Sequence, residues 1–245
     1  MPQVIGVIQG RMGSTRLPGK MLAPLNGRPL LNVLVERVRS AKVDEWWLAT
    51  THEHQDDVTE AWGDALGLRV LRGDPDDVLS RFATIASERR PEWIVRLTAD
   101  NPFVDAAIVD LLVAATARGA AVDHIGAAAE PGLPLGYVPE AVRANALSEL
   151  AATDLAAHDR AHVTSALRAT GRSAGLDVPA TWPPRPDWRW TVDTSADLSM
   201  ADAAFRAFGP AWPRCDYPAM VAILDAHPEI VGRNAAIRQK PVVEG

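Results

Sequence analysis

Short apolar segments alternate with amphipathic segments through the first 119 residues of this chain. The short segments predict buried strands at residues 3–9, 45–51, 68–73 and 92–100. The longer segments carry apolar residues at helical spacing and predict helices at 29–41, 56–66, 76–90 and 105–119. Strands and helices that alternate in this way form βαβ units, in which helices cover both faces of a parallel sheet. We therefore expect an α/β fold whose ligands bind beyond the carboxyl ends of the strands.

The second half of the chain is less regular. A turn-rich segment at 130–137 and a proline-rich connector at 178–187 interrupt it. The remaining patterns predict a strand at 188–194 and helices at 139–152, 159–171, 195–208 and 217–227. We find no internal repeat and no linker, so residues 1–245 are expected to form one domain with a less regular portion at about 120–187.

The composition excludes several classes of protein. A formal net charge of −6 argues against a nucleic-acid coat, because such a domain would be basic as a whole. No apolar run approaches the roughly 20 residues that a membrane span needs, and we expect no membrane partner. Cys215 is the single cysteine, so no internal disulfide can form and the cytoplasm is the expected compartment. We assign the eight tryptophans to packing or to a subunit interface.

A basic, glycine-rich stretch, GRMGSTRLPGK, follows the first predicted strand. It is not a P-loop, because five residues separate Gly13 from Gly19 and Met21 follows Lys20. It is not a dinucleotide fingerprint either, because Ile8 stands where the first glycine is required. Its glycines, hydroxyls and positive charges nevertheless suit a polyphosphate, since backbone N–H groups and basic side chains can both reach phosphate oxygens. A solvated surface turn is the alternative.

Two aspartates stand at the ends of predicted strands. Asp100 follows the strand at 92–100, and Asp193 lies in the strand predicted at 188–194. Magnesium binds one or two protein carboxylates and completes its coordination with phosphate oxygens and water, so the two are candidate metal ligands. Asp197 follows four residues on and fits either a helix-dipole role or a water-mediated metal contact. The alternative for both strand-end aspartates is that each caps the next helix.

The histidines do not indicate a transition metal. The pair at 158 and 162 resembles a zinc-protease motif in spacing, but Asp159 stands where that motif has glutamate and no third ligand is evident. We expect Arg160 and His162 instead to reach an anionic substrate.

Five blocks together resemble one known family. VIQGRMGSTRLPGKML, RGDPDDVLSRF, VRLTADNPFVD, RAHVT and WTVDTSADL occur in this order. They are similar to the spore-coat-polysaccharide-type branch of the acylneuraminate/ketodeoxyoctulosonate cytidylyltransferase family. The resemblance implies a GT-A-like (Rossmann-like) nucleotidyltransferase fold with a mixed, mostly parallel sheet. It also implies transfer of CMP from CTP to an acidic sugar or a related phosphate or phosphonate, with Mg²⁺ as cofactor, pyrophosphate as product and a homodimer as the assembly. The less regular portion at about 120–187 would then serve acceptor binding and dimerisation.

The resemblance assigns roles by position. Lys20, Arg11, Asp100 and Asp193 would be catalytic; Asp100, Asp193 and Asp197 would bind the metal; Arg160 and His162 would bind the acceptor. The nucleotide-binding set would be Gln9, Gly10, Arg11, Met12, Gly13, Ser14, Arg16, Lys20, Arg72, Gly73, Thr98 and Asp100. The chain departs from the family where Gly10 replaces the usual alanine. Two alternatives stay open: the same fold with another nucleotide such as GTP, and a non-catalytic nucleotide-binding module.

Overall fold

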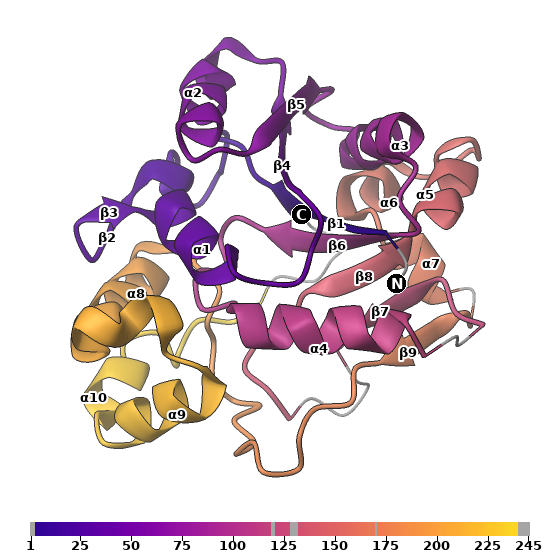
Figure 1. Ribbon diagram of the computed structural model, residues 1–245. Coiled ribbons are helices and arrows are strands. Elements are labelled where there is room, and N and C mark those ends of the chain that lie inside the picture. The colour runs from indigo at the N-terminus through magenta and orange to yellow at the C-terminus, as the bar shows by residue number, and fades with distance from the viewer. Residues whose placement is uncertain (1–2, 119–120, 128–131, 170, 240–245) are drawn as a thin grey trace.

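A seven-stranded sheet forms the centre of the computed structural model, which describes residues 3–118, 121–127, 132–169 and 171–239 (Figure 1). Its strand order is β5-β4-β1-β6-β8-β7-β9. The strands are β1 (Val4–Gln9), β4 (Trp46–Thr51), β5 (Arg69–Gly73), β6 (Trp93–Thr98), β7 (His124–Gly126), β8 (Glu140–Arg143) and β9 (Ser173–Gly175). A separate two-stranded sheet joins β2 (Pro24–Leu25) to β3 (Arg28–Pro29).

The sheet is mixed and mostly parallel, as predicted. Strand β1 pairs in parallel with β4 and β6, and β4 pairs in parallel with β5. Strand β8 is antiparallel to both of its neighbours, β6 and β7, and β7 is parallel to β9. The carboxyl ends of β1, β4, β5 and β6 therefore meet at one edge of the sheet, so the loops that follow these strands lie together.

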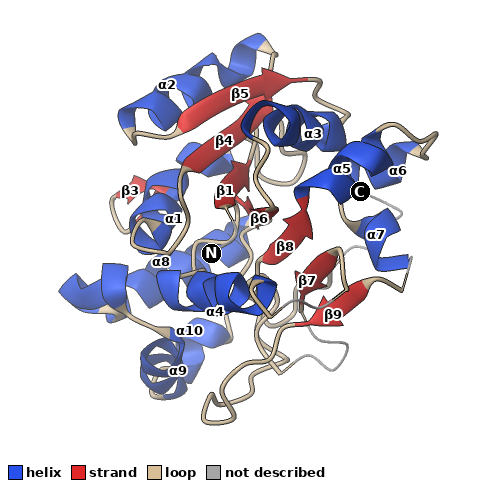
Figure 2. Ribbon diagram, turned by 45° about the vertical axis from the view of Figure 1, so that its right-hand side comes forward, coloured by secondary structure: helices blue, strands red, loops and turns tan. Residues whose placement is uncertain are grey.

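Helices cover both faces of the sheet. The α-helices are α1 (Leu30–Val38), α2 (Asp57–Ala65), α3 (Val78–Arg89), α4 (Ala106–Thr116), α5 (Ala144–Ala151), α6 (Ala157–His162), α7 (Ser165–Ala169), α8 (Ser195–Ala207), α9 (Tyr217–Asp225) and α10 (Pro228–Val231). Short 3₁₀ helices are η1 (Lys20–Leu22), η2 (His54–Asp56) and η3 (Gly209–Arg214). Figure 2 shows α1 and α4 on one side of the sheet and α3 and α5 on the other.

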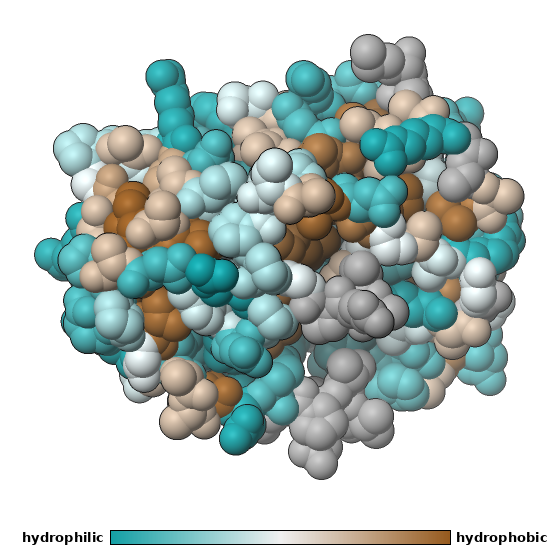
Figure 3. Space-filling view, turned by 90° about the horizontal axis from the view of Figure 1, so that it is seen from below, coloured by the Kyte–Doolittle hydropathy of each residue, from teal (hydrophilic) through white to brown (hydrophobic). Residues whose placement is uncertain are grey.

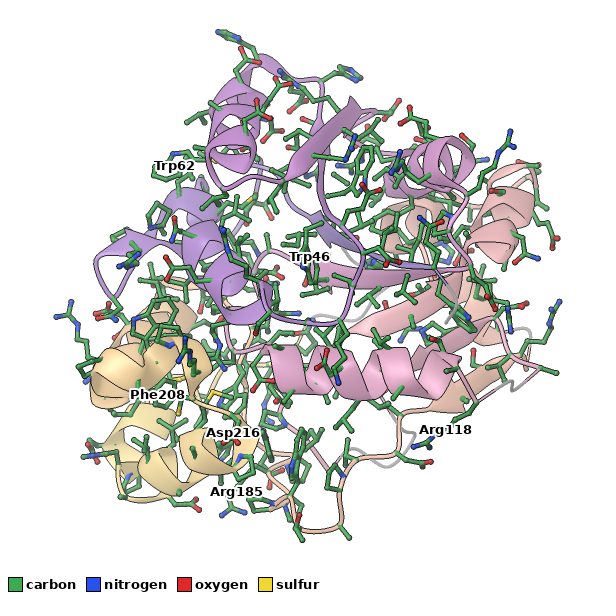
Figure 4. The ribbon with its side chains drawn as sticks, viewed as in Figure 1. Trp46, Trp62, Arg118, Arg185, Phe208 and Asp216 are labelled. Carbon is green, nitrogen blue, oxygen red and sulfur yellow. The ribbon has the colours of Figure 1, made fainter. Side chains whose placement is uncertain are left out.

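Alternate residues of β1 enter two separate cores. Val4 and Ile8 are buried with residues of α1, α4, α8 and α9. Ile5 and Val7 are buried with residues of α3, α5 and α7. This period of two is what a strand covered on both faces requires. Gly6 leaves room for the ring of Trp46 at the start of β4 (Figure 4), because a Cβ on Gly6 would lie 2.2 Å from a ring carbon.

Three predictions for the second half are corrected. The helix predicted at 139–152 begins as strand β8, whose four residues pair with β6. The strand predicted at 188–194 is not a sheet strand; it is extended, and its N–H groups donate to Leu135 and Asp100 in neighbouring loops. The helix predicted at 159–171 breaks at Val163, where φ is +61°, so α6 and α7 are separate. The predicted end of the helix at 105–119 lies outside the described residues.

Four of the eight tryptophans are buried in the cores. They are Trp47, Trp93, Trp190 and Trp212.

The face seen from below has a central hollow in which hydrophobic side chains gather, with hydrophilic side chains around it (Figure 3). None of the helices in the described part of the chain is long and apolar enough to cross a membrane.

Candidate active site

The basic loop between β1 and η1 is held in one shape by its backbone. The N–H groups of Ser14 and Gly19 both donate to the carbonyl of Met12, and the Met12 N–H donates to Asp56 Oδ1 at 2.7 Å. Gly19 has φ +71°, a conformation that favours glycine, and it immediately precedes Lys20. Gly10 begins the loop in a position without room for a side chain, since a Cβ there would lie 2.8 Å from the Cβ of Ala99.

The end of this loop meets both predicted aspartates. Lys20 Nζ lies 2.5 Å from Asp100 Oδ2, 2.9 Å from Asp193 Oδ1 and 3.1 Å from the Val192 carbonyl oxygen. Asp100 follows β6, whereas Asp193 belongs to the extended segment before α8. Three stretches that are distant in the sequence therefore converge on one ammonium group.

Two arginines complete this group of charges. Arg16 lies 3.0 Å and Arg189 lies 2.7 Å from Asp193 Oδ2. We call Lys20, Asp100, Asp193, Arg16 and Arg189 the Lys20 cluster. Burial disfavours the charge on Lys20, but Asp100 and Asp193 outweigh this effect and raise its pKa. Burial would likewise raise the pKa of Asp193, yet Lys20, Arg16 and Arg189 lower it, so both groups are charged at neutral pH.

The oxygen atoms that surround Lys20 Nζ are of the kind that bind a hard cation. Two carboxylates and one carbonyl oxygen all reach a single point, and oxygen ligands of this kind are those that Mg²⁺ prefers. The described residues contain no group of three or more His, Cys, Asp or Glu side chains that could hold a metal ion. Asp100 and Asp193 thus fit a metal that shares its coordination with a bound phosphate.

Asp197 has a structural role in this arrangement. Its side chain is fully buried, and its Oδ2 accepts hydrogen bonds from the N–H groups of Asp193 and Thr194 in a capping box at the start of α8. Its Oδ1 accepts from Arg189 and Asn234, each at 2.9 Å. The structure therefore shows the helix-cap role expected for Asp197, and its water-mediated metal contact stays a prediction.

Arg72 and Gly73 make contacts within the chain, and their predicted contact with the nucleotide stays a prediction. Arg72 donates to the carbonyls of Thr51 and Glu53 and pairs with Glu60 at 2.7 Å, so its guanidinium holds the loop after β4. Gly73 makes room for another arginine: a Cβ there would lie 2.7 Å from Cγ of Arg81.

One cavity opens beside the basic loop, and another lies along β6 and β8. The first, which we call the loop cavity, has a volume of about 670 Å³ and is lined by the end of β1, the start of α3 and α6. Its lining includes Gln9, Gly10, Arg11, Asp76, Arg81 and His162. The second, which we call the β6 cavity, has a volume of about 680 Å³ and lies along β6 and β8. Its lining includes Arg96, Thr98, Asn101, Leu133, Glu140 and Arg168.

Arg11 lies at the loop cavity and Thr98 at the β6 cavity, whereas Gly13 lines neither of them. Arg11 donates to the Pro75 carbonyl at 2.8 Å in the loop cavity. Gly13 faces Gln55, whose Nε2 would lie 3.1 Å from an added Cβ. Thr98 accepts a hydrogen bond from Asn101 at 2.8 Å in the β6 cavity. Gln9 links the two sides, because its Oε1 accepts from Arg96 Nε at 2.8 Å.

Arg160 and His162 are separated from each other. Arg160 pairs with Asp77 at 2.7 Å and donates to the carbonyls of Ala151 and Thr153, so it ties α6 to the start of α3. His162 lines the loop cavity together with Arg11. Neither residue is among those that line the β6 cavity.

Sequence reasoning missed the charged group on the wall of the β6 cavity. Glu140 accepts hydrogen bonds from Arg96, from His124 at 3.0 Å and from Thr164 at 3.0 Å, and Arg168 lies 3.7 Å away. We call these five residues the Glu140 cluster. Burial would raise the pKa of Glu140, but Arg96 and His124 lower it well below its usual range. No motif indicates the group, because its members come from four separate elements.

A family model described as "Cytidylyltransferase" matches residues 5–173. This stretch contains the basic loop and Asp100, and it covers more than half of the chain. The chain belongs to the cytidylyltransferase family.

Full-length relatives agree with this assignment. This cytidylyltransferase-family chain is 35% identical over 239 residues to the spore coat polysaccharide biosynthesis protein SpsF of Bacillus subtilis (strain 168), covering 94% of this chain and 97% of the relative. Its fold matches a cytidylyltransferase from Leptospira borgpetersenii serovar Hardjo-bovis (strain JB197) with a TM-score of 0.87 and 26% identity, covering 98% and 100% of the two chains. A CMP:2-keto-3-deoxy-manno-octonic acid synthetase complexed with CTP shares the fold at a TM-score of 0.62 and 18% identity, covering 83% and 98%. The predicted α/β nucleotidyltransferase fold is thus confirmed.

Proposed function

We propose that this chain transfers CMP from CTP to an acidic sugar, or to a related phosphate or phosphonate, and releases pyrophosphate in a Mg²⁺-dependent reaction. The observation that carries the proposal is the position of Lys20, with its ammonium between Asp100 and Asp193 at the carboxyl edge of the sheet. The choice of CTP as the nucleotide is supported by the solved synthetase that shares this fold, because that protein is complexed with CTP. A positive loop that faces two carboxylates can hold a triphosphate and its metal together.

The chemistry that this site would perform is displacement at the α-phosphorus of CTP. An oxygen of the acceptor forms a bond to the α-phosphorus, and the bond from that phosphorus to the bridging oxygen breaks as pyrophosphate leaves. Negative charge grows on the leaving oxygens, so cations placed near them lower the barrier. A bound Mg²⁺ would supply such charge, and Asp100 and Asp193 would hold it. Arg11, Ser14, Arg16 and Lys20 would hold the triphosphate.

The acceptor is proposed to bind in the β6 cavity. This cavity includes Thr98 and Asn101, which flank Asp100 in the sequence, and it combines apolar walls with the charged side chains of Arg96 and Arg168. An acidic sugar presents both an anionic group and apolar ring faces, which matches this lining. Arg160 is not part of this proposal, because its guanidinium is already bonded to Asp77. A homodimer in the cytoplasm is proposed on the resemblance alone.

The test is release of pyrophosphate from CTP, GTP, ATP or UTP with a panel of acidic sugars, sugar phosphates and phosphonates. We expect release only with CTP, an acceptor and Mg²⁺, and we expect EDTA to abolish it. Lys20→Ala and Asp100→Asn should abolish release while the far-UV circular dichroism spectrum is retained. Arg118→Met is the matched control, since Arg118 lies just beyond α4 with its side chain 65% exposed (Figure 4).

Other outcomes identify the alternatives. Release with GTP in place of CTP would show the same fold with a different nucleotide. Binding of CTP without turnover of any acceptor would indicate a non-catalytic binding module. Full activity of Lys20→Ala would overturn the proposed function.

A further inference from the structure

Arg81 is a buried arginine on the wall of the loop cavity. It lies in the first turn of α3, only 3% exposed, and it is one of the residues that line this cavity. Its aliphatic part packs against Gly73, where no side chain would fit. The chain therefore holds a guanidinium group in a defined place, at the edge of the space next to the basic loop.

The guanidinium of Arg81 lacks the partners that such burial normally requires. Within the described residues it forms no ion pair, its Nε has no hydrogen-bond partner, and its NH1 reaches the Ala49 carbonyl only at 3.5 Å. Arg37 shows the usual arrangement in this same fold: it is equally buried, donates to four carbonyls and lies 3.6 Å from Asp105. A buried charge without such partners is costly.

A second positive charge, that of Arg11, makes the buried charge of Arg81 still more costly when no ligand is bound. Burial and then the charge of Arg11 lower the pKa of Arg81, and the carboxylates of Asp56, Asp74 and Asp77, which raise it, do not offset these two effects. The two guanidinium groups therefore repel each other across the loop cavity. Asp76 lines the same cavity but pairs with neither arginine among the described residues. A neutral group could satisfy the hydrogen bonds of Arg81, but only an anion would also remove this repulsion.

We propose that Arg81 binds a phosphate oxygen of the nucleotide together with Arg11. The inference rests on the proposed function, since it takes the loop cavity as part of the nucleotide site. Arginine donates two parallel N–H groups to one phosphate, and the short distance between the backbone of Gly10 and Arg81 supports a shared ligand, because the Gly10 N–H donates to the same Ala49 carbonyl. Arg81 is thus a phosphate-binding residue outside the basic loop.

The experiment compares the wild-type chain with Arg81→Met, Arg81→Lys and the exposed control Arg118→Met. Binding of CTP, UTP, cytidine and inorganic tripolyphosphate is measured by isothermal titration calorimetry with Mg²⁺ present. We expect Arg81→Met to weaken CTP, UTP and tripolyphosphate alike by about 10- to 100-fold, because a charge-assisted hydrogen bond is lost. The affinity for cytidine should not change. The affinity of Arg81→Lys for CTP, UTP and tripolyphosphate should lie between those of wild type and Arg81→Met, and that of Arg118→Met should equal that of wild type.

Thermal unfolding of the ligand-free proteins separates binding from structure. Arg81→Met keeps the aliphatic length that packs on Gly73 and removes an unpaired buried charge, so its melting temperature should equal or exceed that of wild type. A melting temperature several degrees lower would show a structural role and would overturn the proposal. So would unchanged tripolyphosphate affinity, or a loss confined to CTP and cytidine, which would mean contact with the base. Absence of pyrophosphate release with every acceptor would instead count against the proposed function, whatever the affinity ratios are.

Discussion

The Lys20 cluster and the Glu140 cluster both join charges from several separate elements, yet they leave different room for a ligand. The Glu140 side chain is 13% exposed, and both of its oxygens accept hydrogen bonds from side chains of the chain itself. Asp193 is also paired on both oxygens, but one partner, Arg16, is 29% exposed and belongs to the glycine-rich loop. A triphosphate could take over the cations of the first cluster, whereas in the second the Glu140 carboxylate is satisfied by the chain's own side chains. We infer that the first serves chemistry and the second holds the sheet together.

The largest expected effect is on the Lys20 cluster. Asp193→Asn removes one of the two carboxylates proposed to hold the metal, so the rate of pyrophosphate release should fall by about 10²- to 10³-fold. The free energy of unfolding should also fall, by about 1–3 kcal/mol, because the largely buried Lys20 and Arg189 lose a charged partner while Asn can still accept their hydrogen bonds. Single-turnover kinetics and urea unfolding measure the two quantities. A loss of stability with the rate unchanged would reverse the roles that we assign to the clusters.

The Glu140 cluster should show the opposite behaviour. Glu140→Gln leaves Arg96 buried beside a neutral group, which should cost about 3 kcal/mol of unfolding free energy at pH 7. The pKa of Glu140 is lowered on folding, so the ionised carboxylate stabilises the fold above the unfolded pKa of about 4.3 and this contribution is lost as the pH falls below it. Urea unfolding at pH 7 and at pH 3.5 should therefore show a smaller difference between variant and wild type at the lower pH. A difference independent of pH would contradict the ionic explanation.

Asp197 should have the smallest effect on catalysis. Asp197→Asn places an amide against donors from Thr194 or Asn234 and leaves the buried Arg189 without this carboxylate, which should cost about 3 kcal/mol of unfolding free energy. The Mg²⁺ concentration that gives half-maximal activity should stay within about twofold of wild type, because the carboxylate faces the helix cap. A metal titration of the purified variant checks this expectation. A large rise in the required Mg²⁺ would return Asp197 to the metal site.

The first half of the fold could be predicted because its signals are local. Apolar runs and helical spacing identify β1, β4, β5 and β6, and their parallel order brings the basic loop and Asp100 to one edge. Strand β8 could not be found this way, because its residues Glu140–Arg143 run directly into the helix α5 and continue its pattern. The segment at 188–194 is extended as expected, but it docks on loops instead of the sheet, and only the tertiary structure decides that.

The site was predicted where charge stands out in the sequence and missed where burial decides. Lys20, Asp100 and Asp193 were identified because loop composition and strand-end position mark them. Arg81 was not, since an arginine in a first helical turn looks exposed until Gly73 is seen to make room for it. The role of Asp197 likewise depends on Asn234, 37 residues further along the chain, which no local pattern connects to it.

The tight packing at Gly10 has a consequence for how this sequence can change over time. An alanine at position 10 would meet the Met21 sulfur at 2.5 Å and Ala99 at 2.8 Å, so it requires changes in its neighbours. Gly10→Ala should therefore be better tolerated in a chain that also carries Ala99→Gly, since that change removes the Cβ that an alanine at position 10 would meet.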